Sequence, residues 1–122
     1  MVGIAAYGAY VPRFRLGAST TGWNAGTERS VANFDEDSVT MAVAAGLDCL
    51  RGRDRQFVDG LIFATTTPPY AEKQCAAIIA EALDLRRDIF SADVTDVLRA
   101  GTNGHKAGLD WVAAGSAKQV LV

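Results

Sequence analysis

Four short apolar runs, separated by segments of helical periodicity, are the feature that most constrains the fold of this chain. The runs cover residues 2–11, 58–64, 89–94 and 118–122. Between them, we expect helices over residues 37–51, 72–83 and 99–114. Strands that alternate with helices in this order predict an α/β fold, with a mostly parallel sheet, right-handed crossovers and helices on its faces.

The periodicity of each helical segment predicts which face it buries. The first helix begins after the capping residues 35–38. Its expected buried face comprises Val39, Val43, Leu47 and Leu50. The second helix follows the break at Pro68 and Pro69. Its expected buried side comprises Ile78, Ile79, Ala82 and Leu83.

Small residues dominate one side of the third helix. This stripe consists of Ala100, Gly104, Ala107 and Gly108, followed by Trp111. An interior glycine costs a helix about 1 kcal/mol relative to alanine, so such a stripe favours very close packing. We therefore expect this helix in the interior. Residues 17–34, with three glycines and many polar side chains, are expected to form a long loop.

Composition excludes several functional classes. With 122 residues, 49% of them apolar and 21% charged, the chain fits one globular domain. A net charge of −2 provides no basic surface for nucleic acid or an anionic membrane. We expect no membrane span and no signal peptide, since residues 1–4 lead directly into a strand. Cys49 and Cys75 have no spacing typical of a zinc site or a disulfide. We expect them to be reduced core residues of a cytoplasmic protein.

The fourth apolar run is also the last segment of the sequence. A buried strand at the end of a chain lacks the elements that should cover it. We therefore expect residues 1–122 to be the N-terminal portion of a longer protein, or a chain that a partner completes.

The junction between the third strand and the third helix, residues 93–102, has the form of a nucleophile site. The amides and dipole of a helix start stabilise an anion and lower the pKa of a thiol. Leu98 and Arg99 occupy this helix start, and no cysteine or serine is present. We expect one of two arrangements for Arg99. It either pairs with Asp93 or Asp96, or projects into a pocket at this nucleophile site.

Three segments, taken together, resemble the thiolase superfamily, in the branch of β-ketoacyl-ACP synthase III and 3-hydroxy-3-methylglutaryl-CoA synthase. Residues 3–12 are similar to the opening strand of that branch, and residues 28–42 to the hydroxymethylglutaryl-CoA synthase pattern. The third segment combines residues 64–68 with Arg99-Ala100-Gly101-Thr102. Their order and spacing extend the resemblance over the whole chain.

The resemblance implies a layered fold of two similar halves, with residues 1–122 as the N-terminal thiolase-like half-domain. It implies acyl transfer through a cysteine thioester, with acyl-CoA or an acyl carrier protein as partner and no cofactor besides the coenzyme A thioester substrate. It also implies a homodimer in which strand 89–94 pairs with its mate, or a hetero-oligomer with a thiolase-like partner.

The catalytic positions depart from this family pattern. Leu98 aligns with the cysteine of the hydroxymethylglutaryl-CoA synthases, and Arg99 with that of synthase III. Thr66 stands where the synthases have a glutamate. The resemblance places the catalytic histidine in the second half. We therefore expect no catalytic residue of the acyl-enzyme mechanism in this chain.

The other candidate residues are expected to contact the substrate or to have structural roles. Arg29 and Trp23 lie near the positions where synthase III relatives contact coenzyme A. We expect His105 to be a packed or capping side chain and Cys75 to be an inert thiol. Glu72 and Lys73 are expected in a solvated first helical turn. No residue set predicts a metal site.

Two functions of different classes fit the sequence. The first is a condensing acyltransferase that acts on acyl-CoA with its chemistry re-routed around the missing thiol. The second is a non-catalytic thiolase-like subunit that positions an active partner.

Overall fold

Three parallel strands, in the order β4-β3-β5, form the sheet of the computed structural model, which describes residues 1–122. These strands are β3 (Gly60–Ala64), β4 (Phe90–Val94) and β5 (Val120–Leu121). The central strand β3 is almost entirely buried, and its Leu61 lies opposite Ser91 on one side and Leu121 on the other. The predicted α/β class and parallel sheet are confirmed.

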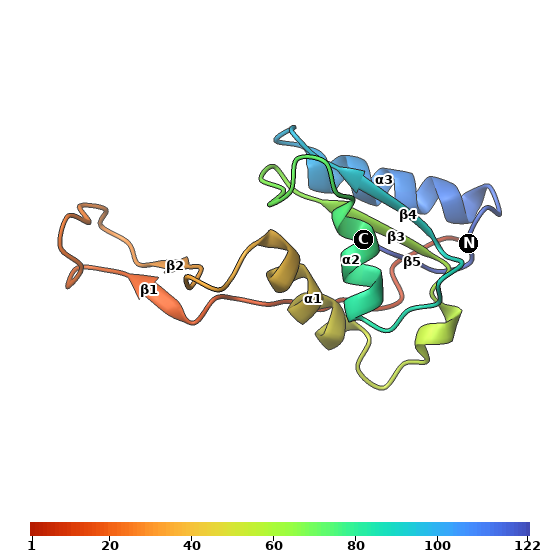
Figure 1. Cartoon of the computed structure of the whole chain (residues 1–122), viewed down its shortest axis with the longest axis horizontal. Coiled ribbons are helices and arrows are strands. Elements are labelled where there is room, and N and C mark those ends of the chain that lie inside the picture. The colour runs from red at the N-terminus through yellow and green to blue at the C-terminus, as the bar shows by residue number, and fades with distance from the viewer.

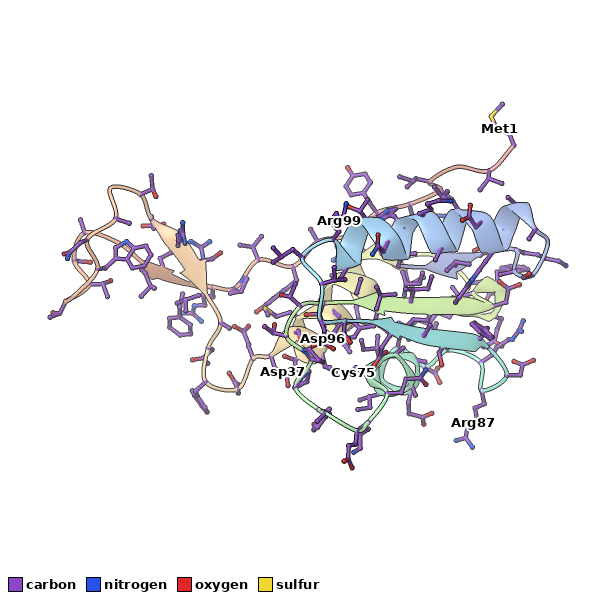
Figure 2. The ribbon with its side chains drawn as sticks, turned by 90° about the horizontal axis from the view of Figure 1, so that it is seen from above. Met1, Asp37, Cys75, Arg87, Asp96 and Arg99 are labelled. Carbon is purple, nitrogen blue, oxygen red and sulfur yellow. The ribbon has the colours of Figure 1, made fainter.

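Three helices pack around this sheet: α1 (Ser38–Cys49), α2 (Cys75–Ala82) and α3 (Ala100–Ala113). Figure 2 shows α2 and α3 on opposite faces of the sheet, and α1 packs against α2. The main apolar core lies between β3 and the helices α1 and α2, around Leu61, Cys75 and Leu83. None of the three helices has the length and apolar character that crossing a membrane requires.

The predicted start of α1 is confirmed by a capping box. Asp37 accepts a hydrogen bond from the Thr40 amide at 2.8 Å, and the Thr40 hydroxyl accepts one from the Asp37 amide, also at 2.8 Å. The start of α2 is capped from a strand instead. The Gln74 side chain caps no amide of α2, and the Asp93 carboxylate of β4 accepts from the Cys75 and Ala76 amides, both at 2.7 Å.

The predicted helix faces are correct only in part. Leu47 is 43% exposed, and Gly46 is buried in its place because Leu83 packs directly over it. A Cβ added at Gly46 would lie 2.7 Å from Cδ1 of Leu83. On α2, Ala82 is exposed, whereas Cys75 and Ala76 are fully buried.

The small-residue stripe of α3 packs closely on the sheet, as predicted. A Cβ added at Gly108 would lie 2.8 Å from Cγ2 of Val122, and one at Gly104 would lie 3.3 Å from Cγ2 of Ile62. The interior placement of this helix is wrong for the chain as described, because its outer face, including Leu109 at 42%, is exposed.

Residues 2–11 form no strand, so this prediction is wrong. The segment runs beside the C-terminal end of α1, where Arg53 donates to the Ala5 carbonyl at 3.0 Å. Its side chains are largely exposed, with Ile4 at 73% and Tyr7 at 90%. A strand requires a neighbour for its backbone groups, and no strand of the chain pairs with this segment.

An arm, which we define as residues 12–35, projects from the body (Figure 1). It contains two strands, β1 (Phe14–Leu16) and β2 (Arg29–Val31), which pair in antiparallel fashion. The long loop predicted over residues 17–34 is therefore in part a hairpin. Each strand has only three residues, too few to show alternation in the sequence.

Asp59 anchors β5 to the sheet and makes this contact sensitive to acid. Its carboxylate accepts hydrogen bonds from the Lys118 amide at 2.9 Å and the Gln119 amide at 2.9 Å. Burial favours the neutral acid, but these amides and Arg86 outweigh it, so the pKa of Asp59 is lowered.

A lowered folded-state pKa means that Asp59 stabilises the fold above its ordinary pKa, and that this stabilisation disappears as the pH falls through the lowered value. We expect Asp59→Asn to lower the free energy of unfolding at pH 7 and to weaken its dependence on pH in the acid range. Urea denaturation between pH 7 and pH 3 measures both. An unchanged acid slope would contradict the anchoring role.

Candidate functional site

The carboxyl ends of β3 and β4 form the best candidate site. The chain leaves β3 towards α2 on one face of the sheet and leaves β4 towards α3 on the other. Parallel α/β sheets bind ligands in the crevice that opens where neighbouring strands diverge in this way. The two strand ends are joined by a hydrogen bond of 3.0 Å from the Thr65 amide to the Val94 carbonyl. Figure 2 shows Asp37, Cys75, Asp96 and Arg99 at this end of the body.

Side-chain hydrogen bonds fix the loop after β3, which carries Thr66. Ser38 at the start of α1 donates to the Thr67 carbonyl at 2.9 Å. At the other end of the loop, Gln74 donates to the Ser91 carbonyl at 3.0 Å, and Asp93 holds the first amides of α2. The loop at the carboxyl end of β3 is therefore held by α1 and β4 together.

The loop after β4 places Leu98 at the head of α3. Asp96 adopts a left-handed conformation, with φ of 61°, and its carboxylate accepts from the Thr95 hydroxyl at 2.9 Å. Leu98 is 96% exposed. The resemblance expects the acyl-carrying thiol at Leu98 or at Arg99, and the structure has an exposed leucine followed by an arginine at this helix start.

Arg99 is the N-cap of α3, and its side chain makes no capping hydrogen bond. It forms no ion pair with Asp93 or Asp96, contrary to one of the two expected arrangements, because those carboxylates accept bonds from α2 and Thr95. The Gly101 and Thr102 amides have no acceptor within the chain. Two free donors therefore lie beside Leu98 at the positive end of the helix dipole.

Cys75 lies at the start of α2 but is not a displaced nucleophile. The residue is fully buried, and its Sγ lies 3.7 Å from the Lys73 carbonyl oxygen. Burial, together with the negative charge of Asp93, raises the pKa of the Cys75 thiol. Both effects disfavour the reactive thiolate, in agreement with the predicted inert role.

His105, Glu72 and Lys73 are all exposed. His105 is exposed on α3 and has no hydrogen-bond partner, so its predicted packed or capping role is wrong. Glu72 and Lys73 precede α2 and are exposed, with Lys73 Nζ 5.1 Å from the Tyr70 ring centre. No three His, Cys, Asp or Glu side chains gather as a metal site.

Arg29 and Trp23 come together on the arm. The Arg29 guanidinium carbon lies 5.8 Å from the Trp23 ring centre, and Trp23 Nε1 donates to the Thr27 carbonyl at 3.2 Å. The arm extends from the end of the body that carries Asp37, Asp96 and Arg99 (Figure 2). The sequence predicts both residues as candidates but not their contact, because the three-residue strands of the hairpin that brings Arg29 beside Trp23 leave no alternation pattern.

Comparison with known proteins agrees with this architecture. No protein-family model matches the chain. It is 38% identical over 128 aligned positions to hydroxymethylglutaryl-CoA synthase of Thermococcus sibiricus, and 34% identical to that of Pyrococcus furiosus. Each alignment covers 98% of this chain and 37% of the relative, so the chain spans little more than a third of the length of these enzymes.

Solved structures give the same result for the fold. β-Ketoacyl-[acyl carrier protein] synthase III of Thermus thermophilus superposes with a TM-score of 0.82 and 28% identity, over 97% of this chain and 40% of that one. MvaS in complex with 3-hydroxy-3-methylglutaryl coenzyme A superposes with a TM-score of 0.83 and 27% identity, over 94% and 31%. The chain is thus a thiolase-like homologue of the hydroxymethylglutaryl-CoA synthases, with the fold of the synthase III-like condensing enzymes over the part it covers.

Proposed function

We propose that this chain is the acyl-CoA-handling part of a condensing acyltransferase and that it forms no acyl-enzyme of its own. The observation that carries the proposal is the side chain at the head of α3, where Leu98 is 96% exposed in place of a thiol. The one cysteine at the same end of the sheet, Cys75, is fully buried.

The free amides at the start of α3 give this site a chemical use without a thiol. An acyl thioester bound beside Leu98 would place its carbonyl oxygen near the Gly101 and Thr102 amides, which stabilise the negative charge of a tetrahedral intermediate. A second thioester, deprotonated at its α-carbon, would attack that carbonyl carbon, and coenzyme A would leave as the thiolate. Thr66 cannot remove the α-proton, so we assign the base to a group outside residues 1–122.

We assign a coenzyme A contact to Arg29 and Trp23. A guanidinium binds phosphate oxygens through paired donors, and an indole ring offers a face on which adenine can stack. We expect Arg29→Gln to weaken acetyl-CoA binding about tenfold, as is typical for loss of a charge-assisted contact. Quenching of tryptophan fluorescence measures it. Arg51→Gln, which changes an 82% exposed side chain on the body, is the matched control and should bind normally.

A second candidate function, a non-catalytic subunit beside an active thiolase-like partner, is favoured by the free edge of the sheet. The outer edge of β4 is unpaired, which leaves its backbone groups open to the dimer contact that the resemblance implies.

Turnover of labelled acetyl-CoA, with and without a co-purified partner, tests the proposal. Condensation product formed by the protein containing this chain, without a covalent adduct, would support the acyltransferase. Product formed only when a separate thiolase-like partner is present would favour the subunit. If neither mixture forms product or retains labelled acetyl-CoA, the acyl-CoA proposal is wrong.

A thiol introduced by Leu98→Cys should be unusually reactive. The helix dipole and Arg99 favour the thiolate there, so we expect alkylation at pH 7 to be about three to ten times faster than for a control thiol. Leu109→Cys is that control, because Leu109 lies on the same helix and is 42% exposed. Iodoacetamide labelling followed by mass spectrometry measures both rates. Equal rates would show that the start of α3 does not activate a nucleophile.

A further inference from the structure

The arm is held to the body at its base. Its hydrogen bonds are all internal apart from the contacts with Glu36, and none reaches residues 37–122. A two-stranded hairpin is marginally stable alone, and it has no packing partner in Figure 1. The direction of the arm therefore depends on the short segments that enter and leave it.

One side chain joins these two segments. Glu36 follows the arm, and its Oε2 accepts a hydrogen bond from the Asn33 amide at 2.8 Å. Its Oε1 accepts the hydroxyl of Tyr10, which precedes the arm. A single carboxylate thus connects the chain on both sides of the hairpin.

Both partners of this bond are anchored on α1. The Ala9 amide, next to Tyr10, donates to Asp48 near the C-terminal end of α1 at 3.3 Å. Glu36 immediately precedes Asp37, the N-cap of the same helix. The Tyr10–Glu36 bond therefore closes a loop that begins and ends on one rigid element.

We propose that Tyr10, Glu36 and Asn33 form a clamp that sets the direction of the arm, and that breaking the clamp lets the arm swing about its base. The arm carries Trp23 and Arg29, so the clamp would also set how these residues lie relative to the carboxyl ends of β3 and β4. That consequence rests on the proposed coenzyme A contact, whereas the clamp itself does not.

The charges around the clamp predict the pH ranges in which it opens. The bond to Glu36, followed by burial and the charges of Glu36 and Asp35, raises the pKa of Tyr10. The Asn33 amide, followed by the Tyr10 hydroxyl, lowers the pKa of Glu36 against the opposing effect of burial. Asp37 is engaged with the Thr40 amide. The clamp should therefore stay closed through the neutral range, weaken as the pH falls through the lowered pKa of Glu36, and open as it rises through the raised pKa of Tyr10.

Distances between two spin labels test the clamp directly. The labels are placed by Thr21→Cys on the arm and Arg87→Cys on the body, both at exposed positions, in a Cys49→Ser background. Cys75 is fully buried and stays unlabelled. We expect one narrow distance distribution at pH 7, and one roughly twofold broader or shifted after Tyr10→Phe or Glu36→Ala.

Tyr7→Phe is the matched control, because the Tyr7 hydroxyl has no hydrogen-bond partner and the residue is 90% exposed. It should leave the distribution unchanged. Distributions of Tyr10→Phe and Glu36→Ala that superpose on those of Tyr7→Phe and the unsubstituted chain would overturn the proposal. The measurement needs no acyl-CoA, so its failure is distinguishable from a failure of the proposed function.

Discussion

Replacing Leu83 with alanine is expected to lower the free energy of unfolding by about 2–5 kcal/mol, the usual cost of truncating a leucine in a packed core. Leu83 is fully buried where α2 ends and packs against Gly46 of α1. Urea denaturation measures the change. Leu109→Ala, at a 42% exposed position on α3, is the control, and we expect it to cost less than about 0.5 kcal/mol.

A double-mutant cycle with Gly46→Ala isolates the contact between the two helices. Alone, the added methyl group meets Leu83, and the clash, typically about 1–3 kcal/mol, offsets the gain in helix propensity. In the Leu83→Ala background the methyl group has room, and the same change should stabilise the protein by about 1 kcal/mol. Strictly additive effects would contradict the close packing of α1 on α2.

Replacing Asp93 with alanine is expected to lower the free energy of unfolding by about 2–3 kcal/mol, because two amides at the start of α2 lose a charged acceptor. Both bonds are 2.7 Å long, and the Gln74 side chain provides no substitute cap. Hydrogen exchange should increase first at Cys75 and Ala76.

Asp96→Asn is the matched control for Asp93→Ala. Asp96 lies three residues further along the chain, and its one hydrogen-bond partner is the neighbouring Thr95 hydroxyl. Asparagine tolerates the left-handed backbone of this position well, so we expect little change. Equal destabilisation by the two variants would mean that Asp93 has no special role in capping α2.

The body of the fold could be predicted because its signals are local. Apolar runs marked β3, β4 and β5, and the capping residues before Ser38 marked the start of α1. The failure at residues 2–11 has a different origin. Their composition suits a buried strand, but a strand also needs a neighbour, and strand pairing depends on contacts that are distant in sequence.

The candidate site was predictable in its residues but not in its geometry. The sequence places Leu98, Arg99 and Thr66 in the loops that follow two neighbouring strands. No pattern in the sequence predicts the hydrogen bonds that fix these loops. The sequence predicts Asp93 as a partner of Arg99, yet its carboxylate accepts hydrogen bonds from α2, which follows a different strand. A pattern within one segment cannot reveal a hydrogen bond between two.

This chain is expected to carry no acyl group on any of its side chains. Incubation with labelled acetyl-CoA, followed by measurement of the intact mass, tests it directly. We predict an unchanged mass for the whole population, because neither Leu98 nor Arg99 can form a thioester and Cys75 is fully buried. A stable covalent acetyl adduct, mapped by peptide analysis to a residue within 1–122, would contradict the account.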